Sequence, residues 1–248
     1  MYNDRSRVMK RTERQHLKEN EMERFAREAR ELLERRRRET TVLVAVVAVV
    51  AIVALGYLAW RQQVQSKASA LLAQAMAAQD ARVGPPGMPG AGLTFPTERE
   101  RAQAAQTKFK VAADAYPKTD AGIYARYQEA GEWMILDNPK EAARAYQDVI
   151  DHAGSSGIYG QMARLGLAEA QARQGQYEQA INTFKDMAQR KDGPLPVDGI
   201  LMQLGRTYLE AGKPADARQT FTRLVDEYPE SPFSGDARRE LDTLKKTT

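Results

Sequence analysis

The stretch from Thr41 to Trp60 limits what this chain can fold into more than any other, because its twenty consecutive residues carry no charge. A helix of this length extends about 30 Å, which matches the hydrocarbon core of a bilayer. Tyr57 and Trp60 stand together at one end, where aromatic side chains favour the membrane interface. A buried core helix is the competing interpretation, but a domain this small does not bury a helix that is apolar on all sides. The sequence therefore predicts one transmembrane helix, at 40–60.

The charges that flank this helix indicate its orientation. Residues 1–39 carry thirteen Lys/Arg and nine Asp/Glu, and four consecutive arginines, Arg35 to Arg38, stand next to the apolar stretch. Short segments rich in Lys and Arg remain in the cytoplasm. We therefore expect a cytoplasmic N-terminus and a translocated segment 61–248. A cleaved signal peptide is the alternative, but its apolar region normally has about 7–15 residues after a short leader. An uncleaved signal anchor fits the sequence better.

The basic segment 1–39 contains no Pro or Gly and is predicted to be helical. Two interpretations of it stay open. It is either a solvated helix whose basic end lies on anionic lipid head groups, or a dock or coiled coil through which the chain self-associates at 8–38. Glu alternates with Arg along it, and residues 61–248 carry equal numbers of acidic and basic residues. We therefore expect no nucleic-acid partner.

Beyond the membrane, aromatic residues recur at a nearly constant interval. Four of them, spaced by 37, 38 and 37 residues, are Phe109, Tyr146, Phe184 and Phe221. Alanine precedes each by four positions, and a small residue precedes each of the last three by sixteen. A turn residue also stands nine positions before the last three: Asp137, Gly175 and Gly212. This periodicity predicts stacked helical hairpins, in which small residues allow close approach and each aromatic fills the gap between hairpins.

The pattern resembles the tetratricopeptide repeat, whose usual period is about 34 residues. The best copy is 201–229, LMQLGRTYLEAGKPADARQTFTRLVDEYP, which matches nearly every position of that motif. The extra residues of each period fall in the connections SSGIYG and KDGPLPVDG. The predicted fold is all-α. It consists of an N-terminal helix, one transmembrane helix and a tetratricopeptide-like α-solenoid of about three and a half hairpins over 97–248, with a C-terminal capping helix.

The first hairpin matches only about half of the repeat motif. Thr97 and Glu100 have the spacing of a capping box, which predicts the start of its second helix. Its first helix would be the membrane-proximal segment 61–83. Between them, residues 84–96 are rich in Pro and Gly and are predicted to form a long loop. This loop is either a tolerated insertion or a binding element.

In solenoids of this kind the first helix of each hairpin lines the concave face. The repeat register places ten residues there: Tyr124, Tyr127, Met134, Met162, Leu165, Glu169, Arg173, Met202, Arg206 and Glu210. Tyr and Met side chains form an adaptable surface suited to extended protein segments. The alternative is that several of these side chains belong to the core. Repeat domains that clamp chaperone C-termini use Lys and Asn at positions where this chain has Tyr127 and Gly131. A carboxylate clamp is therefore not expected.

No motif in the sequence predicts an enzyme. The chain has no cysteine, which excludes disulfides, zinc–thiolate sites and thiol catalysis. His16 and His152, which we assign to the basic helix and to a loop, lack the spacing of metal ligands. No nucleotide-binding or nucleophile motif occurs. The Asp and Glu residues are assigned to exposed helical positions, where solvation is the default. We expect no catalytic residue, no cofactor and no metal.

The complete layout resembles the ancillary subunit of the bacterial SecYEG translocon and its relatives. That resemblance implies an inner-membrane protein whose periplasmic repeats bind translocon subunits, a periplasmic chaperone or other envelope factors during protein export and folding. The loop at 84–96 departs from the pattern of that family. Two other classes stay open. One is a structural protein that links the inner membrane to cell-wall or outer-membrane assembly, and the other is an organellar import receptor.

Overall fold

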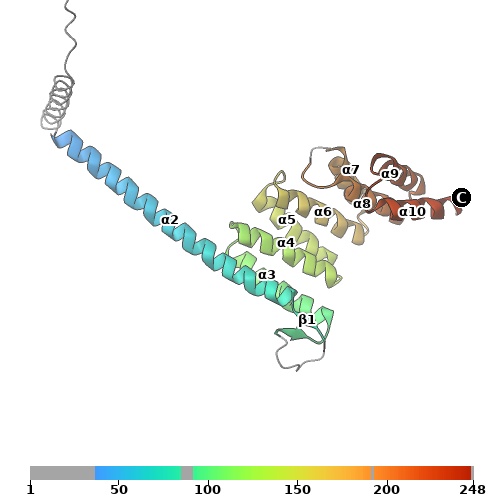
Figure 1. Ribbon diagram of the computed structural model, residues 1–248, viewed down its shortest axis with the longest axis horizontal. Helices are drawn as coiled ribbons and strands as arrows, with labels where there is room; N and C mark the ends of the chain where they lie inside the picture. The colour runs from blue at the N-terminus through green and yellow to red at the C-terminus, as the bar shows by residue number, and fades with distance from the viewer. Residues whose placement is uncertain (1–36, 85–91, 191–192, 247–248) are drawn as a thin grey trace, which may run out of the picture. The chain divides into compact units, whose positions relative to one another are not determined.

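The computed structural model describes residues 37–84, 92–190 and 193–246. Nearly all of the expected self-association segment, 8–38, therefore lies outside the described residues. The chain divides into two compact units, 1–62 and 63–248, which are treated separately below. The helices (Figure 1) are α2 (Arg37–Gln79), α3 (Glu98–Ala115), α4 (Asp120–Ile135), α5 (Pro139–Ala153), α6 (Ile158–Arg173), α7 (Tyr177–Gln189), α8 (Val197–Glu210), α9 (Pro214–Glu227) and α10 (Ser234–Lys246).

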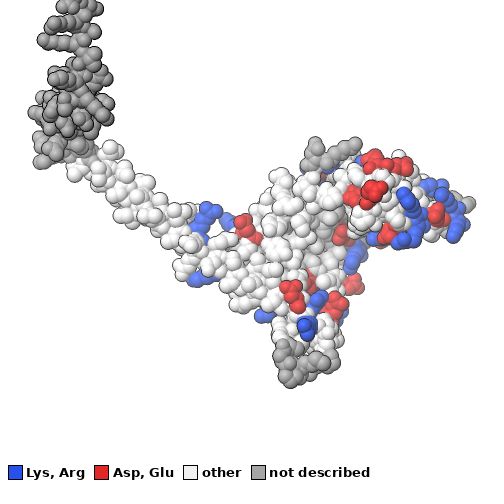
Figure 2. All heavy atoms as spheres, viewed as in Figure 1, with Lys and Arg blue, Asp and Glu red and all other residues white. Residues whose placement is uncertain are grey.

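The described part of the first unit is the N-terminal portion of α2. All of its large apolar side chains between residues 42 and 60 are more than half exposed. Figure 2 shows this stretch as a surface without charged side chains. The helix is long and apolar enough to cross a membrane, with a mean hydropathy of 2.9 in its most apolar window. The rings of Tyr57 and Trp60 contact each other, with centroids 6.0 Å apart.

The second unit is a stack of helical hairpins, which confirms the predicted all-α solenoid. The portion of α2 from residue 63 pairs with α3, and the pairs α4–α5, α6–α7 and α8–α9 follow in order (Figure 1). Helix α10 packs on α9 and caps the C-terminal end. The first hairpin is thus complete, and its first helix lies within the segment 61–83 that the sequence assigned to it from a half-matched repeat. Its core joins Ala75 and Ala78 of α2 to Phe109 of α3.

The recurring aromatic residues form the core between helices, as their spacing predicts. Phe109, Phe184 and Phe221 are completely buried. A Cβ atom built on Gly205 would overlap the Phe221 ring. Only glycine therefore allows α8 and α9 to approach this closely without rearrangement.

The turns inside the hairpins adopt the left-handed conformation. Asp137, Gly175 and Gly212, the three predicted turn residues, have φ values of 56°, 75° and 69°. Glycine adopts this conformation without steric cost, whereas aspartate is one of the few other residues that tolerate it. The predicted helix start at residue 97 is also confirmed, because the Thr97 side chain accepts a hydrogen bond from the Glu100 amide at 3.2 Å.

A short parallel pair of strands lies at the two ends of the segment predicted as a long loop, 84–96: one strand directly precedes this segment and the other lies within it. Strand β1 (Arg82–Val83) pairs with β2 (Thr94–Phe95), so that Arg82 faces Thr94 and Val83 faces Phe95. Two-residue strands carry too little side-chain alternation to be recognised in a sequence. The pair closes the base of the Pro/Gly-rich segment and joins the end of α2 to the start of α3.

A buried polar contact fixes the end of α2 on α4. The Gln79 amide donates a 2.8 Å hydrogen bond to Glu132 and accepts one of 3.1 Å from Gln128. Glu132 is only 1% exposed, and its Oε2 atom has no hydrogen-bond partner among the described residues. The expectation that acidic residues lie at exposed helical positions is therefore wrong here. Burial raises the pKa of Glu132, although the hydrogen bond from Gln79 and the charge of Arg101 act in the opposite direction.

Glu132→Gln is expected to raise the melting temperature of the full-length protein at pH 7, because it removes a buried charge and keeps an oxygen that accepts from Gln79. The folded-state pKa lies above the ordinary value of 4.5. Stability from this group is therefore greatest below pH 4.5 and declines as the pH rises through the folded-state value. Circular dichroism melts between pH 4.5 and 8 measure both effects. Glu230→Gln, at an exposed position, is the control. A lower melting temperature with an unchanged pH profile would contradict this prediction.

Candidate functional site

The first helices of the hairpins line the inner side of the solenoid. Helix α4 contacts α6, and α6 contacts α8, more extensively than any two of the second helices α3, α5, α7 and α9 contact each other. In a curved stack the elements on the inner side are the ones that approach most closely. The concave face is therefore formed by α4, α6 and α8, the helices to which the predicted site residues belong.

Nine of the ten predicted residues reach the surface of these helices. Six are half-buried: Tyr124, Tyr127, Met134, Met162, Leu165 and Glu169. Three are exposed: Arg173, Arg206 and Glu210. Met202 is different, because it is 2% exposed and belongs to the core of the C-terminal hairpins. Helix α8 packs against α6, α7 and α9, so little of its circumference remains for a groove. Met202 thus lies beneath the concave surface rather than on it.

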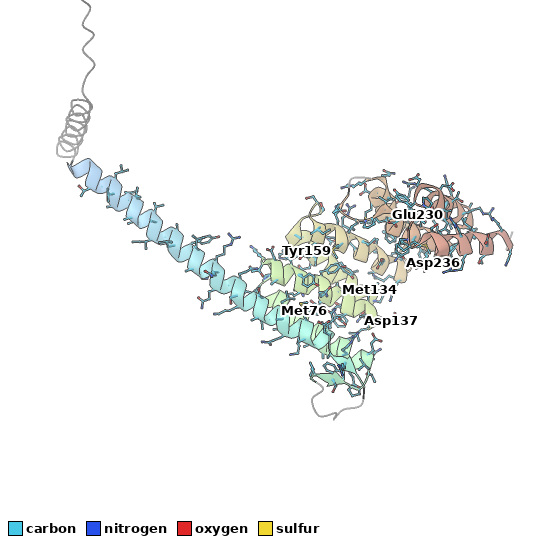
Figure 3. The ribbon with its side chains drawn as sticks, in the orientation of Figure 1. Met76, Met134, Asp137, Tyr159, Glu230 and Asp236 are labelled. Atoms are coloured by element: carbon cyan, nitrogen blue, oxygen red, sulfur yellow. The ribbon has the colours of Figure 1, made fainter. Side chains whose placement is uncertain are left out.

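Three half-buried tyrosines, Tyr124, Tyr127 and Tyr159, give the concave face an aromatic character. The Tyr124 and Tyr159 rings have centroids 5.9 Å apart, and those of Tyr127 and Tyr146 are 5.7 Å apart, each pair tilted by 58°. Figure 3 labels Tyr159, at the start of α6, and Met134, near the end of α4. The repeat register did not identify Tyr159 as a surface residue. It assigned Tyr146 to the packing between hairpins, and this ring is 6% exposed and lies against Gly166 of the next hairpin.

A polar hollow of about 270 Å³ lies between α6 and α8. Four predicted residues line it: Glu169, Arg173, Arg206 and Glu210. Gln203 and Thr207 complete the polar wall, and the sequence reasoning missed both. They follow Met202 and Arg206 in the chain. Thr207 is only 4% exposed, so a register based on surface positions would not include it.

The two arginines of this hollow bind partners outside it. Arg173 Nη1 donates to the Met134 carbonyl oxygen at 3.2 Å. Arg206 Nη2 lies 3.7 Å from an Asp236 carboxylate oxygen on α10. Burial raises the pKa of Glu169, while the charge of Arg173 and a hydrogen bond from Gln203 act to lower it. The hollow therefore contains a partly desolvated carboxylate beside the positive charge of Arg173.

The described residues show no arrangement for catalysis by a metal ion. In residues 37–84, 92–190 and 193–246, no three His, Asp or Glu side chains are grouped to hold one. His152 lies in the last turn of α5, not in a loop as predicted. Its Nδ1 atom is 2.9 Å from the Asp148 carbonyl oxygen and 3.2 Å from the Asp148 carboxylate. These contacts lie within one helix and hold the imidazole against α5.

Stacked hairpins with a partly exposed concave face define the class of protein: a solenoid scaffold that binds other proteins, typically without catalysis. Comparison with protein families agrees with this class. Residues 36–242 match the tetratricopeptide repeat-like domain, and the chain belongs to this family. The predicted resemblance to tetratricopeptide repeats is thereby confirmed. The finer resemblance to a translocon subunit receives no support from this match.

Two solved structures agree with the fold. Both are described as nearly identical TPR-like repeats of a kinesin light chain from Podosopora anserina, and one of the two carries a point substitution. Their sequences are 14% and 13% identical to this chain, and each has a TM-score of 0.56. They cover 73% of this chain and 86–87% of their own. A tetratricopeptide repeat protein from Parabacteroides merdae, 14% identical, covers 60% of this chain and 56% of its own, with a TM-score of 0.47. No curated protein matches the chain significantly.

Proposed function

We propose that this chain is a membrane-anchored scaffold whose concave face binds extended segments of other proteins during protein export. The observation that carries the proposal is the composition of that face. It presents the half-buried rings of Tyr124, Tyr127 and Tyr159 and a polar hollow, on helices α4, α6 and α8. Aromatic surfaces with adjacent polar groups hold extended chains through side-chain contacts without requiring one fixed sequence.

The apolar stretch of α2 supports a membrane anchor. Its side chains between residues 42 and 60 have no protein partner that buries them in the described part of the first unit, and a bilayer would cover them. Arg35 to Arg38 favour a cytoplasmic N-terminus, which would place the repeats on the periplasmic side of a bacterial inner membrane. The resemblance in layout then favours translocon subunits or a periplasmic chaperone as partners.

The proposal is tested in intact cells in two steps. Protease added outside the cytoplasmic membrane is expected to digest residues 61–248 and spare the N-terminal segment. Purification of the full-length protein from crosslinked membranes, followed by mass spectrometry, is expected to recover translocation or folding factors. Recovery of cell-wall or outer-membrane assembly proteins instead would favour a structural envelope role. Repeats that are accessible only from the cytosol would contradict the proposed orientation and favour an import receptor.

A further inference from the structure

We propose that a second binding site lies between the starts of α6 and α8 and the end of α7, and that it takes a tryptophan or tyrosine side chain of a partner protein. The site is a cavity of about 510 Å³. Ligand pockets usually have about 300–1,000 Å³. None of the ten residues predicted for the concave face lines this cavity. The inference therefore goes beyond the proposed function and does not depend on it.

The first step is the origin of the cavity. The two connections that lengthen the repeat period border it, with Ser156 between α5 and α6 and Leu195 between α7 and α8. A Cβ atom on Gly160 would overlap the carbonyl oxygen of Gly154, so the first of these connections packs directly on α6. The residues beyond the usual period of about 34 therefore form walls of the cavity.

The second step is the apolar part of the lining. Met187 of α7 and Ile200 of α8 are each 3% exposed, and the half-buried Leu195 packs against the same core. Methionine makes favourable contacts with aromatic rings. Among the described residues, no Asp or Glu lines the cavity, and Arg190 is the charged residue of the lining. The cavity thus offers an apolar surface without a carboxylate that would attract a cation.

The third step is a hydrogen-bond acceptor without a donor. Gln161, in the first turn of α6, is 5% exposed and lines the cavity. Its Nε2 atom donates to the Ser155 carbonyl oxygen. Because a carbonyl oxygen only accepts, this contact fixes which side of the amide carries the Gln161 oxygen. That oxygen, Oε1, accepts no hydrogen bond from any residue that the structure describes.

The fourth step compares what the cavity would accept. A carboxylate supplies no donor to Gln161 Oε1 and loses its hydration against Met187 and Ile200. An ammonium group supplies a donor but also loses its hydration there. An aliphatic side chain covers the apolar lining and leaves Gln161 Oε1 desolvated without a partner, which is costly. Tryptophan and tyrosine combine a large apolar ring with one neutral donor, so they satisfy both parts of the lining.

The test uses N-acetyl-tryptophanamide and its analogue methylated at the indole nitrogen, which has no indole N–H to donate. Full-length protein in detergent carries ¹³C-labelled methionine methyl groups, and the Met187 signal is assigned with the Met187→Leu variant. N-acetyl-tryptophanamide is expected to shift this signal saturably, with a dissociation constant of about 1 mM or lower. The methylated analogue is expected to bind at least about tenfold more weakly, because Gln161 Oε1 then lacks its donor.

Two variants separate recognition from folding. Gln161→Met removes the acceptor and is expected to bring the affinities of the two compounds within about twofold of each other. Gln179→Met, at an exposed position of α7, is expected to keep the tenfold difference. Melting curves show whether each variant is folded, and the comparison of the two compounds on the wild-type protein needs neither variant.

An unshifted Met187 signal, or equal affinities of the two compounds on the wild-type protein, would overturn this inference. Shifts confined to Met134 and Met162 of the concave face would also overturn it and would leave the proposed function standing. Saturable binding at Met187 with the tenfold difference would support the second site even if the concave face captured no partner.

Discussion

Replacing Phe221 with alanine is expected to lower the free energy of unfolding by about 3–5 kcal/mol, the range for truncating a buried phenylalanine. The side chain is completely buried between α8 and α9 and lies directly against Gly205. Because Gly205 has no side chain, nothing on that side can move into the space that the ring would vacate. Denaturant unfolding of the full-length protein measures the total effect. Hydrogen exchange is expected to increase most in α8, α9 and α10, since each repeat contacts only its neighbours.

Phe233→Ala is the matched control for this experiment. Phe233 is 37% exposed, so the same truncation removes less buried surface and leaves no closed cavity. It is expected to cost less than half as much as the change at Phe221. Equal losses at the two positions, or a loss at Phe221 below about 1 kcal/mol, would contradict the packing described for the C-terminal hairpins.

Replacing Arg126 with methionine is expected to have the second largest effect, a loss of about 3 kcal/mol, because one guanidinium serves three carboxylates. It lies 2.5 Å from Glu129, 2.7 Å from Asp148 and in contact with Asp114. These residues join α3, α4 and α5. Glu129 is 4% exposed, so removal of Arg126 would leave a buried charge without its cation. Breaking a buried ion pair costs about 3–5 kcal/mol, and the partial exposure of Asp114 and Asp148 places this case at the lower end.

The matched control is Arg144→Met, because Arg144 pairs with Glu141 in an exposed contact at 2.8 Å. Such pairs contribute about 1 kcal/mol or less.

The two variants should also differ in how their stability changes at acid pH. Partial burial acts to raise the pKa of Asp114, but hydrogen bonds from Lys110 and Arg126 hold it below its ordinary value of 3.8. Asp114 therefore contributes stability above pH 3.8 that is lost as the pH falls through the lowered value.

The Arg126→Met variant is expected to lose part of this acid dependence, whereas Arg144→Met should retain it. Melting temperatures measured from about pH 2.5 to 7 provide the comparison. A variant at Arg126 that melts like the Arg144 variant would show that the three-carboxylate contact contributes no more than a surface pair.

The spacing of aromatic and small residues was enough to predict the solenoid. Phe184 and Phe221 recur with the repeat because each hairpin needs one large side chain where two helices cross, and Gly205 marks where they approach most closely. The left-handed turn residues, such as Asp137, follow from the same register. These features depend on contacts within one hairpin or between neighbours, so a period in the sequence records them.

The polar interior could not be predicted in this way. Glu129 is buried because Gln106 of α3, Trp133 of its own helix and Arg126 bind its carboxylate. Glu132 is buried because Gln79, fifty-three residues earlier, donates to it. Hydrophobic periodicity does not predict the polar partners of either glutamate, because it treats every glutamate as a solvent-facing residue.

The ten residues that the repeat register assigns to the concave face lie on α4, α6 and α8, but not all of them reach the surface. The register gave Glu169 and Arg206, which line the hollow, and also Met202, which is buried. Whether a position on α8 is exposed depends on how closely α6, α7 and α9 surround it, and the repeat register alone does not contain that information.

The binding role of the concave face is tested most directly by site-specific photocrosslinking in intact cells. Photoreactive residues are placed at Tyr124, Met162 and Arg206 on the concave helices, and at the exposed positions Arg144 of α5 and Lys185 of α7 as controls. We expect the three concave positions to capture the same partner protein and the two control positions to capture none of it. Capture of that partner from α5 and α7, with none from α4, α6 and α8, would contradict the proposed site.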